Sequence, residues 1–238
     1  MTPALLARLQ AARAAGTPTL LATNLATGAQ LLLPGDDAPP ALHDHATKAL
    51  HADRSATVQL GNETWFLHAH NPPMRLVIVG AVHIAQALVP IAARLGYAVL
   101  ITDPRRAFAN EDRFPQGTMN VTVSTDWPDE ALDAARPDTR TAIVTLTHDP
   151  KLDDPALDRA LRSPAFYIGA LGSRKTHAAR LDRLRALGHD AALARIQGPV
   201  GLNIGAVTAG EIALSIMAQI VATRRGADLM IVRRGAQP

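Results

Sequence analysis

The pattern of apolar and polar positions changes near residue 72, where prolines interrupt the chain. Before that point, helical spacing alternates with short strand-like runs, which predicts a small α/β domain over residues 1–72. We place the domain boundary there because Pro72 and Pro73 stop a β ladder and stiffen the chain. The elements expected in this domain are helices at Pro3–Ala15 and Ala41–Ala52 and strands at Thr19–Leu25, Gln30–Leu33, Ala56–Leu60 and Thr64–Ala69.

After the boundary, continuous apolar runs alternate with segments of helical spacing. Strands that are apolar on both faces and alternate with helices are typical of a parallel sheet covered on both sides. The predicted fold class is therefore α/β, with a Rossmann-like doubly wound parallel sheet over residues 73–238 that follows the smaller N-terminal α/β domain. The strands expected are Arg75–Gly80, Ala98–Thr102, Asn120–Val123, Thr141–Leu146 and Ala165–Ala170, and the helices Ile84–Leu95, Pro128–Ala135, Pro155–Leu161, Ser173–Leu187 and Thr208–Arg224.

The composition narrows the class of protein. The 238 residues include no cysteine, which excludes disulfides, iron–sulfur clusters, cysteine zinc sites and a thiol nucleophile. A net charge of +3 and an aromatic content of 3% give no reason to expect a nucleic-acid partner. No uncharged run reaches the roughly 18 residues needed to span a bilayer, and the start of the chain does not resemble an export signal. A cytoplasmic protein with no membrane partner is expected.

Ligands of doubly wound folds bind beyond the carboxyl ends of the strands. The segment Gly80–Ala85 lies in the place of a G-x-G-x-x-G loop but keeps only the first glycine, and Val82 puts a branched side chain in the path of a phosphate. Asp103 follows the next strand, where an acid would bind the ribose of a dinucleotide. Dinucleotide binding and a plain βαβ unit, in which Asp103 begins a turn with Pro104, both remain open.

Two further loops carry candidate chemistry at the strand ends. After the strand at Thr141–Leu146, His148 and Asp149 form either a general base or hydrogen-bonding clamp, or a polar loop in which Asp149 caps the next turn. Near residue 200, Gly201 and Gly205 indicate backbone held close to a neighbour. Glu211, three residues after Thr208, matches a capping box.

The most informative segment follows the last predicted strand and opens a helix. Gly169 and Gly172 permit a tight turn, and Ser173 is a good N-cap. Arg174 and Lys175 then lie in the first turn, where the helix dipole disfavours cations. Free backbone N–H groups, a hydroxyl and two cations make a phosphate site, and we favour it over a solvated basic helix start.

Pairs of histidines and pairs of arginines are weaker candidates for a functional site. Of the pairs His43-x-His45 and His68-x-His70, only the second would share a face, as part of a strand, and no acid nearby completes a ligand set. We therefore expect no metal site. The pairs Arg224-Arg225 and Arg233-Arg234 are expected to be a solvated helix end and tail.

Taken in order, the segments resemble the Rossmann-type domain of the XdhC/CoxI family, accessory proteins of molybdenum hydroxylases such as xanthine dehydrogenase. The resemblance implies that the chain binds the molybdenum cofactor (molybdopterin), a pterin dithiolene with a terminal phosphate. It also implies that the protein protects this cofactor, supports its sulfuration and inserts it into the apoenzyme. The stretches that carry the resemblance are Leu76–Leu88, Thr102–Pro115, Thr147–Leu157, Tyr167–Leu184 and Pro199–Ala222.

The resemblance also implies a site and partners. The phosphate is expected at Gly172–Lys175, with His83, Asp103 and His148 around the pterin or metal end. The expected partners are a xanthine dehydrogenase-type apoenzyme, a cysteine desulfurase as the sulfur source, and a second copy of the chain in a homodimer. The residues expected to bind the cofactor are Gly80, Val82, His83, Asp103, Arg105, His148, Asp149, Gly169, Gly172, Ser173, Arg174, Lys175, Gly201, Gly205 and Glu211.

The sequence departs from the family pattern in two places. Val82 and Ala85 stand where the family usually has glycine, and residues 1–70 hold no Gly-Gly-Cys motif, so the functions of that cysteine are not transferred. The alternative function is an NAD(P)-dependent oxidoreductase, which needs Asp103 on a ribose, or Arg105 and Arg106 on a 2′-phosphate. A purely structural component of a hydroxylase complex, with empty strand ends, is a third possibility. As a cofactor chaperone, the chain would carry no catalytic residues.

Overall fold

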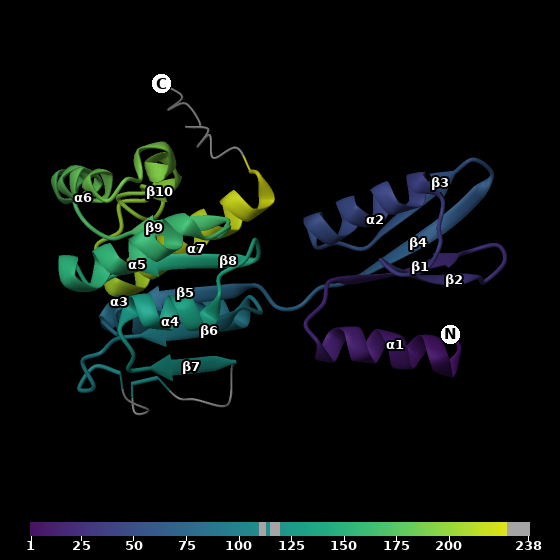
Figure 1. The fold of residues 1–238 in the computed structure, drawn as a ribbon, viewed down its shortest axis with the longest axis horizontal. Helices are drawn as coiled ribbons and strands as arrows, with labels where there is room; N and C mark the ends of the chain where they lie inside the picture. The colour runs from purple at the N-terminus through teal and green to yellow at the C-terminus, as the bar shows by residue number, and fades with distance from the viewer. Residues whose placement is uncertain (110–112, 115–119, 228–238) are drawn as a thin grey trace, which may run out of the picture. The chain divides into compact units, whose positions relative to one another are not determined.

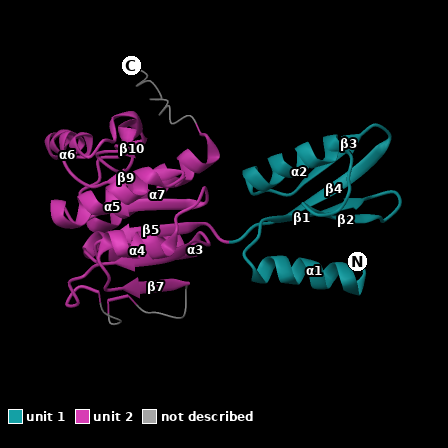
Figure 2. Cartoon of the chain, in the orientation of Figure 1, with its two compact units in different colours: residues 1–72 teal, residues 73–238 magenta. Residues whose placement is uncertain are grey.

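The computed structural model describes residues 1–109, 113–114 and 120–227. Two compact units, Met1–Pro72 and Pro73–Pro238, are coloured separately in Figure 2. Part of the family-like stretch Thr102–Pro115 and the basic pair Arg233-Arg234 lie outside the described residues. No helix in the described part of the chain is long and apolar enough to cross a membrane.

The N-terminal unit is an antiparallel sheet with a helix on each face (Figure 1). Its strand order is β2-β1-β4-β3. Leu42 of the second helix packs on one face with Leu20 and Leu67, and Leu5 of the first helix packs on the other with Leu21. The elements are α1 (Pro3–Ala14), β1 (Thr19–Asn24), β2 (Gln30–Leu33), α2 (Pro40–Ala52), β3 (Ala56–Leu60) and β4 (Glu63–His70).

The C-terminal unit is a six-stranded parallel sheet with the order β10-β9-β8-β5-β6-β7. The order therefore reverses between β5 and β8, as in doubly wound dinucleotide-binding folds, and the predicted fold class is confirmed. The strands are β5 (Arg75–Val79), β6 (Ala98–Thr102), β7 (Val121–Ser124), β8 (Thr141–Thr145), β9 (Tyr167–Ala170) and β10 (Ile196–Gln197). The helices are α3 (His83–Arg94), α4 (Pro128–Ala135), α5 (Pro150–Arg162), α6 (Arg174–Ala186) and α7 (Ala209–Arg225).

Alternate side chains of the central strand face two separate apolar cores. Leu76 and Ile78 of β5 join a core that includes residues of α3 and α7, whereas Val77 and Val79 join one that includes residues of α4, α5 and α6. Because period-2 alternation gives each face its own apolar surface, both faces of β5 need a helical cover. This explains why the strand is continuously apolar in sequence.

Apart from shifts of one or two residues at the ends of elements, two predictions in the C-terminal unit differ from the structure. The helix expected at Pro155–Leu161 begins at Pro150, because Asp149 caps it by accepting a hydrogen bond from the backbone N–H of Lys151 at 2.9 Å. Pro155 then lies inside the helix instead of starting it. The sixth strand, β10, was not predicted, and it follows a 3₁₀ helix at Asp190–Arg195. Two residues are too few to produce a strand pattern.

Candidate functional site

The carboxyl ends of the parallel strands bring the candidate loops to one edge of the sheet. Gly80, after β5, has a φ of +106°, and a Cβ on it would lie 2.5 Å from Cγ2 of Thr147 in the loop after β8. Only glycine fits where these two loops touch. Val82 is half-buried and packs against the core beneath α3, whereas His83 begins that helix and is exposed.

Asp103, at the end of β6, joins its own loop to the loop after β5. It is fully buried, and its Oδ2 accepts a hydrogen bond from the N–H of Ala81 at 2.9 Å. Arg105 donates three more bonds to the carboxylate, from its backbone N–H, Nε and Nη2, at 3.0, 2.9 and 2.8 Å. Burial raises the pKa of Asp103, but the bonds from Arg105 and Ala81 outweigh it and hold the pKa below its usual value.

The hydrogen bonds between Asp103 and Arg105 change the roles that were expected for these two residues. A carboxylate offers about four acceptor positions, and the four bonds to Asp103 use them within the protein. The guanidinium of Arg105 also stacks on the ring of Phe108, 4.6 Å from the ring centre. Their primary role here is to fix the loops, and direct cofactor contacts by them stay a prediction.

The loop after β8 gives its three polar residues different surroundings. Asp149 is the N-cap of α5, so the capping interpretation is confirmed. Thr147 donates its hydroxyl to Oδ1 of Asp153 at 2.7 Å and accepts a bond from the N–H of Asp149 at 3.1 Å. His148 is exposed with a φ of +61°, an uncommon conformation for a residue other than glycine. Its role in binding stays a prediction.

The two glycines near the start of α6 serve different purposes. Gly169 lies within β9, inside the expected strand and not in the turn, and a Cβ there would lie 2.5 Å from Val200 Cγ2. It is therefore needed for packing. Gly172 does lie in the turn, with a φ of +147°, and a Cβ there would lie 3.3 Å from the Thr176 side chain.

The start of α6 has the predicted cap and the predicted cations. Ser173 Oγ accepts a hydrogen bond from the N–H of Thr176 at 3.1 Å. Arg174 and Lys175 are exposed in the first turn, which holds no acidic residue. The helix start therefore offers positive charge from its dipole and from two side chains at the same place.

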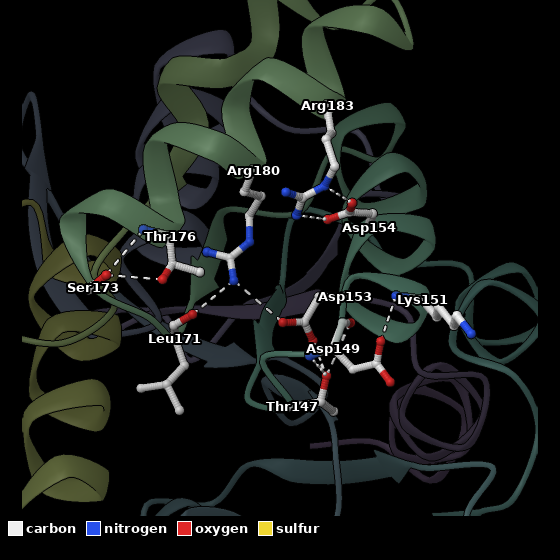
Figure 3. A network of polar contacts seen from close by, with 10 residues as sticks. All are labelled: Thr147, Asp149, Lys151, Asp153, Asp154, Leu171, Ser173, Thr176, Arg180 and Arg183. Carbon is white, nitrogen blue, oxygen red and sulfur yellow. Dashed lines mark hydrogen bonds and ion pairs between the residues drawn. The ribbon is translucent and has the colours of Figure 1, made fainter.

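A buried ion pair beneath this turn was not predicted (Figure 3). Arg180 of α6 is 1% exposed, and its Nη2 donates to the backbone oxygen of Leu171 at 2.8 Å and to Oδ2 of Asp153 at 3.4 Å. Burial raises the pKa of Asp153, and the bond from Thr147 and the charge of Arg180 only partly oppose it. One signal could have revealed Arg180: it lies four residues before the buried Leu184, on the same helical face.

The neighbour of the glycine-rich loop before α7 is α7 itself. Gly201 has a φ of +96°, and a Cβ on it would lie 2.4 Å from Oγ of Ser215. Its N–H donates to Oε1 of Gln219 at 2.7 Å, and Gln219 also accepts the hydroxyl of Tyr167 at 2.6 Å. Gly205 has a φ of +75° but no atom within 4 Å of a Cβ position. Only Gly201 therefore has the close neighbour that was expected.

The capping box at the start of α7 is confirmed. Glu211 Oε2 accepts the N–H of Thr208 at 2.8 Å and of Val207 at 2.9 Å, and Thr208 Oγ1 accepts the N–H of Glu211 at 3.3 Å. These bonds to Thr208 and Val207 lower the pKa of Glu211. The carboxylate is thus engaged by its own helix, and a further contact with a cofactor stays a prediction.

Loss of this cap should be measurable as a loss of stability. Thr208→Ala is expected to lower the free energy of unfolding by about 1 kcal/mol, because the first turn of α7 loses its side-chain acceptor. Urea denaturation followed by circular dichroism would measure the change. Thr208→Ser keeps the hydroxyl and should stay close to the parent protein, and equal losses in both variants would contradict a capping role.

The two histidines on β4 lie side by side. The ring centres of His68 and His70 are 4.1 Å apart. Burial, followed by the charges of His68 and Arg13, lowers the pKa of His70. Within residues 1–109, 113–114 and 120–227, no group of three or more histidine, cysteine or acidic residues could hold a metal ion.

Comparisons with curated proteins show relatives that are longer than this chain. It is 34% identical over 175 residues to Uncharacterized protein YqeB of Escherichia coli K12, which covers 73% of this chain and 31% of that protein. It is 32% identical over 160 residues to a probable xanthine dehydrogenase subunit of Bacillus subtilis 168, covering 67% and 46%. It is 34% identical over 154 residues to the molybdenum cofactor insertion chaperone PaoD of E. coli K12, covering 64% and 41%. The chain spans less than half the length of these relatives.

A solved structure and a family model agree on the fold. A crystal structure described as a xanthine dehydrogenase from Bacillus halodurans matches with a TM-score of 0.70 at 24% identity, covering 95% of this chain and 65% of that chain. The family model described as the XdhC Rossmann domain matches residues 76–220. Since this match spans more than half of the chain, the protein belongs to the XdhC family.

Proposed function

We propose that this chain binds the molybdenum cofactor and delivers it to a xanthine dehydrogenase-type molybdenum hydroxylase. Two relatives support this reading by name, one as a molybdenum cofactor insertion chaperone and one as part of a probable xanthine dehydrogenase. The observation in this chain that carries the proposal is the start of α6, where Arg174 and Lys175 are exposed at the positive end of the helix. The terminal phosphate of the cofactor is the group that such a helix start would bind.

Other residues at the same edge of the sheet are suited to the rest of the cofactor. His83 and His148 are both exposed at the ends of strands β5 and β8, so they are available to contact the pterin. The chain has no cysteine, so any sulfuration it supports needs sulfur from another protein, for which we propose a cysteine desulfurase. We also propose that the chaperone works as a homodimer, because two-fold dimers are the commonest class of homo-oligomer.

The same geometry gives less support to an NAD(P)-dependent oxidoreductase. In dinucleotide-binding folds, the acid after the second strand accepts hydrogen bonds from the ribose. Here that acid is Asp103, and Ala81 and Arg105 already occupy its acceptor positions. Val82 further replaces the glycine that lets a pyrophosphate approach the backbone.

The basic helix start can be tested by removing its two charges. The double variant Arg174→Ser with Lys175→Ser is expected to weaken binding of the molybdenum cofactor about thirtyfold, since two partly exposed charged contacts of about 1 kcal/mol each are lost. Anaerobic titration of the full chain with cofactor, and activation of apo-hydroxylase by the loaded protein, would measure the effect. NAD⁺ and NADP⁺ titrated in parallel test the alternative function.

A matched control separates this site from general charge effects. Lys48 and Arg54 are exposed in the N-terminal unit, and Lys48→Ser with Arg54→Ser makes the same change in net charge. This control should bind the cofactor within twofold of the parent protein. Equal weakening in both double variants, or unchanged binding in the Arg174 and Lys175 variant, would refute the placement of the phosphate.

A further inference from the structure

The guanidinium of Arg180 has more donors than the protein satisfies. Its Nη2 is bonded to Leu171 and Asp153, but Nε and Nη1 have no hydrogen-bond partner in the described part of the chain, although both are buried. An arginine keeps its charge in proteins, and buried donors are nearly always paired. Two unpaired donors on one fully buried cation therefore call for an explanation.

One of these donors faces the turn that starts α6. A Cβ on Gly172 would lie 3.8 Å from Nη1 of Arg180 and 3.3 Å from the side chain of Thr176. Figure 3 shows the guanidinium directed from α6 toward the turn that holds Ser173 and Thr176. The absence of a side chain at Gly172 thus lets the backbone of the turn lie close to the buried cation.

Among the described residues, Arg180 forms a single ion pair, with Asp153. Its contact with Asp153 is 3.4 Å long, and the other oxygen of that carboxylate is bonded to Thr147. Asp154 is held by Arg183 in a separate ion pair on the outer side. No other acidic side chain among the described residues forms an ion pair with Arg180, and the first turn of α6 holds none.

The first turn of α6 and the buried Arg180 beneath it both offer hydrogen-bond donors that suit an anion. The backbone N–H groups of Arg174 and Lys175 belong to the first turn of a helix, which leaves such groups without intrahelical partners. The hydroxyls of Ser173 and Thr176 lie 3.0 Å apart in the same turn. Amides, hydroxyls and a guanidinium whose one paired acid, Asp153, contacts only Nη2 favour a tetrahedral dianion.

We propose that Arg180 is the inner wall of a phosphate-binding site whose outer wall is the first turn of α6. Its ligand class is a phosphate group, either free phosphate or a phosphate monoester. The inference rests on the proposed function only for the identity of the natural ligand, the molybdenum cofactor. An ordinary basic helix start offers only surface cations to a ligand. In this site Arg180 would add a buried cation.

The test measures binding of inorganic phosphate and of glycerol 3-phosphate to the full chain by calorimetry at constant ionic strength. The parent protein is expected to bind both, and Arg180→Met to bind each at least tenfold more weakly. Arg195→Met is the matched control, because Arg195 is bonded to the backbone oxygens of Leu161, Ser163 and Ala165, none of which belongs to α6. This control should bind phosphate within twofold of the parent protein.

A second measurement follows phosphate binding in the parent protein itself. In the parent protein, phosphate should shift the Nε–H resonance of Arg180 in a ¹⁵N spectrum, with Arg180→Lys used to assign the signal. Failure of the parent protein to bind phosphate, an unmoved resonance, or unchanged affinity in Arg180→Met would overturn the inference. Binding of the cofactor without binding of phosphate would leave the proposed function standing, whereas phosphate binding without cofactor binding would refute only the proposed function.

Discussion

Replacing Asp103 by alanine is expected to lower the free energy of unfolding of the C-terminal unit by about 2–4 kcal/mol. The change leaves the buried N–H of Ala81 without its acceptor, which alone costs about 1–3 kcal/mol. It also removes the charged partner of Arg105, whose side chain is 39% exposed, so this second loss is smaller. Urea denaturation followed by circular dichroism measures the sum.

The variant Asp103→Asn removes the negative charge but keeps the shape of the side chain, so it separates their contributions to stability. The amide has one oxygen for the four donors that the carboxylate satisfies, so this variant should lie between the parent protein and Asp103→Ala. If Asp103→Ala costs less than about 1 kcal/mol, the bonds between the loops after β5 and β6 contribute little to stability.

The pH dependence of stability gives an independent check on Asp103. Its pKa is lower in the folded protein than the ordinary value, so its ionised form stabilises the fold above that ordinary value. The contribution is lost as the pH falls through the folded pKa, and the parent protein should lose stability as the pH drops from about 5 to about 2. Asp103→Asn should lose less over the same interval, and equal slopes would contradict the assignment.

The parts of the fold that were predictable depend on short-range patterns. The continuous apolar runs at β5 and β8 identify a sheet buried on both faces, and the caps at Ser173 and Thr208 involve residues only three positions apart. The order of the strands follows from packing between distant segments. β10 has two residues, so its place beside β9 depends on a neighbour that no local pattern reveals.

The exposed residues of the candidate site were predicted from the sequence, but the buried Arg180 was not. Arg174 and Lys175 are recognisable because they stand beside a cap that the sequence shows. Arg180 lies on a mostly polar helix, and its burial depends on contacts with Leu171 and with Asp153, 27 residues away in sequence. The one local signal for Arg180 is its spacing of four residues from the buried Leu184, and its polar partners cannot be read from the local sequence.

Two glycines in the loop before α7 should differ in how much stability is lost when each is replaced by alanine. Gly201→Ala is expected to lower the free energy of unfolding by about 3 kcal/mol. Its φ of +96° costs about 1–2 kcal/mol for any residue with a Cβ, and the overlap with Ser215 adds about 1–3 kcal/mol. The displaced backbone would also strain the bond from the N–H of Gly201 to Gln219.

Gly205→Ala is the control that separates the two causes, because Gly205 also has a positive φ but no atom within 4 Å of its Cβ position. It should lose only the conformational part, about 1–2 kcal/mol. Adding Ser215→Ala to Gly201→Ala removes the atom that lies 2.4 Å from the new Cβ and should recover part of the remaining loss. Thermal and urea denaturation of all four proteins would measure these differences. Equal losses for Gly201→Ala and Gly205→Ala would show that contact with α7 is not what requires a glycine at position 201, because conformational strain alone would then account for both.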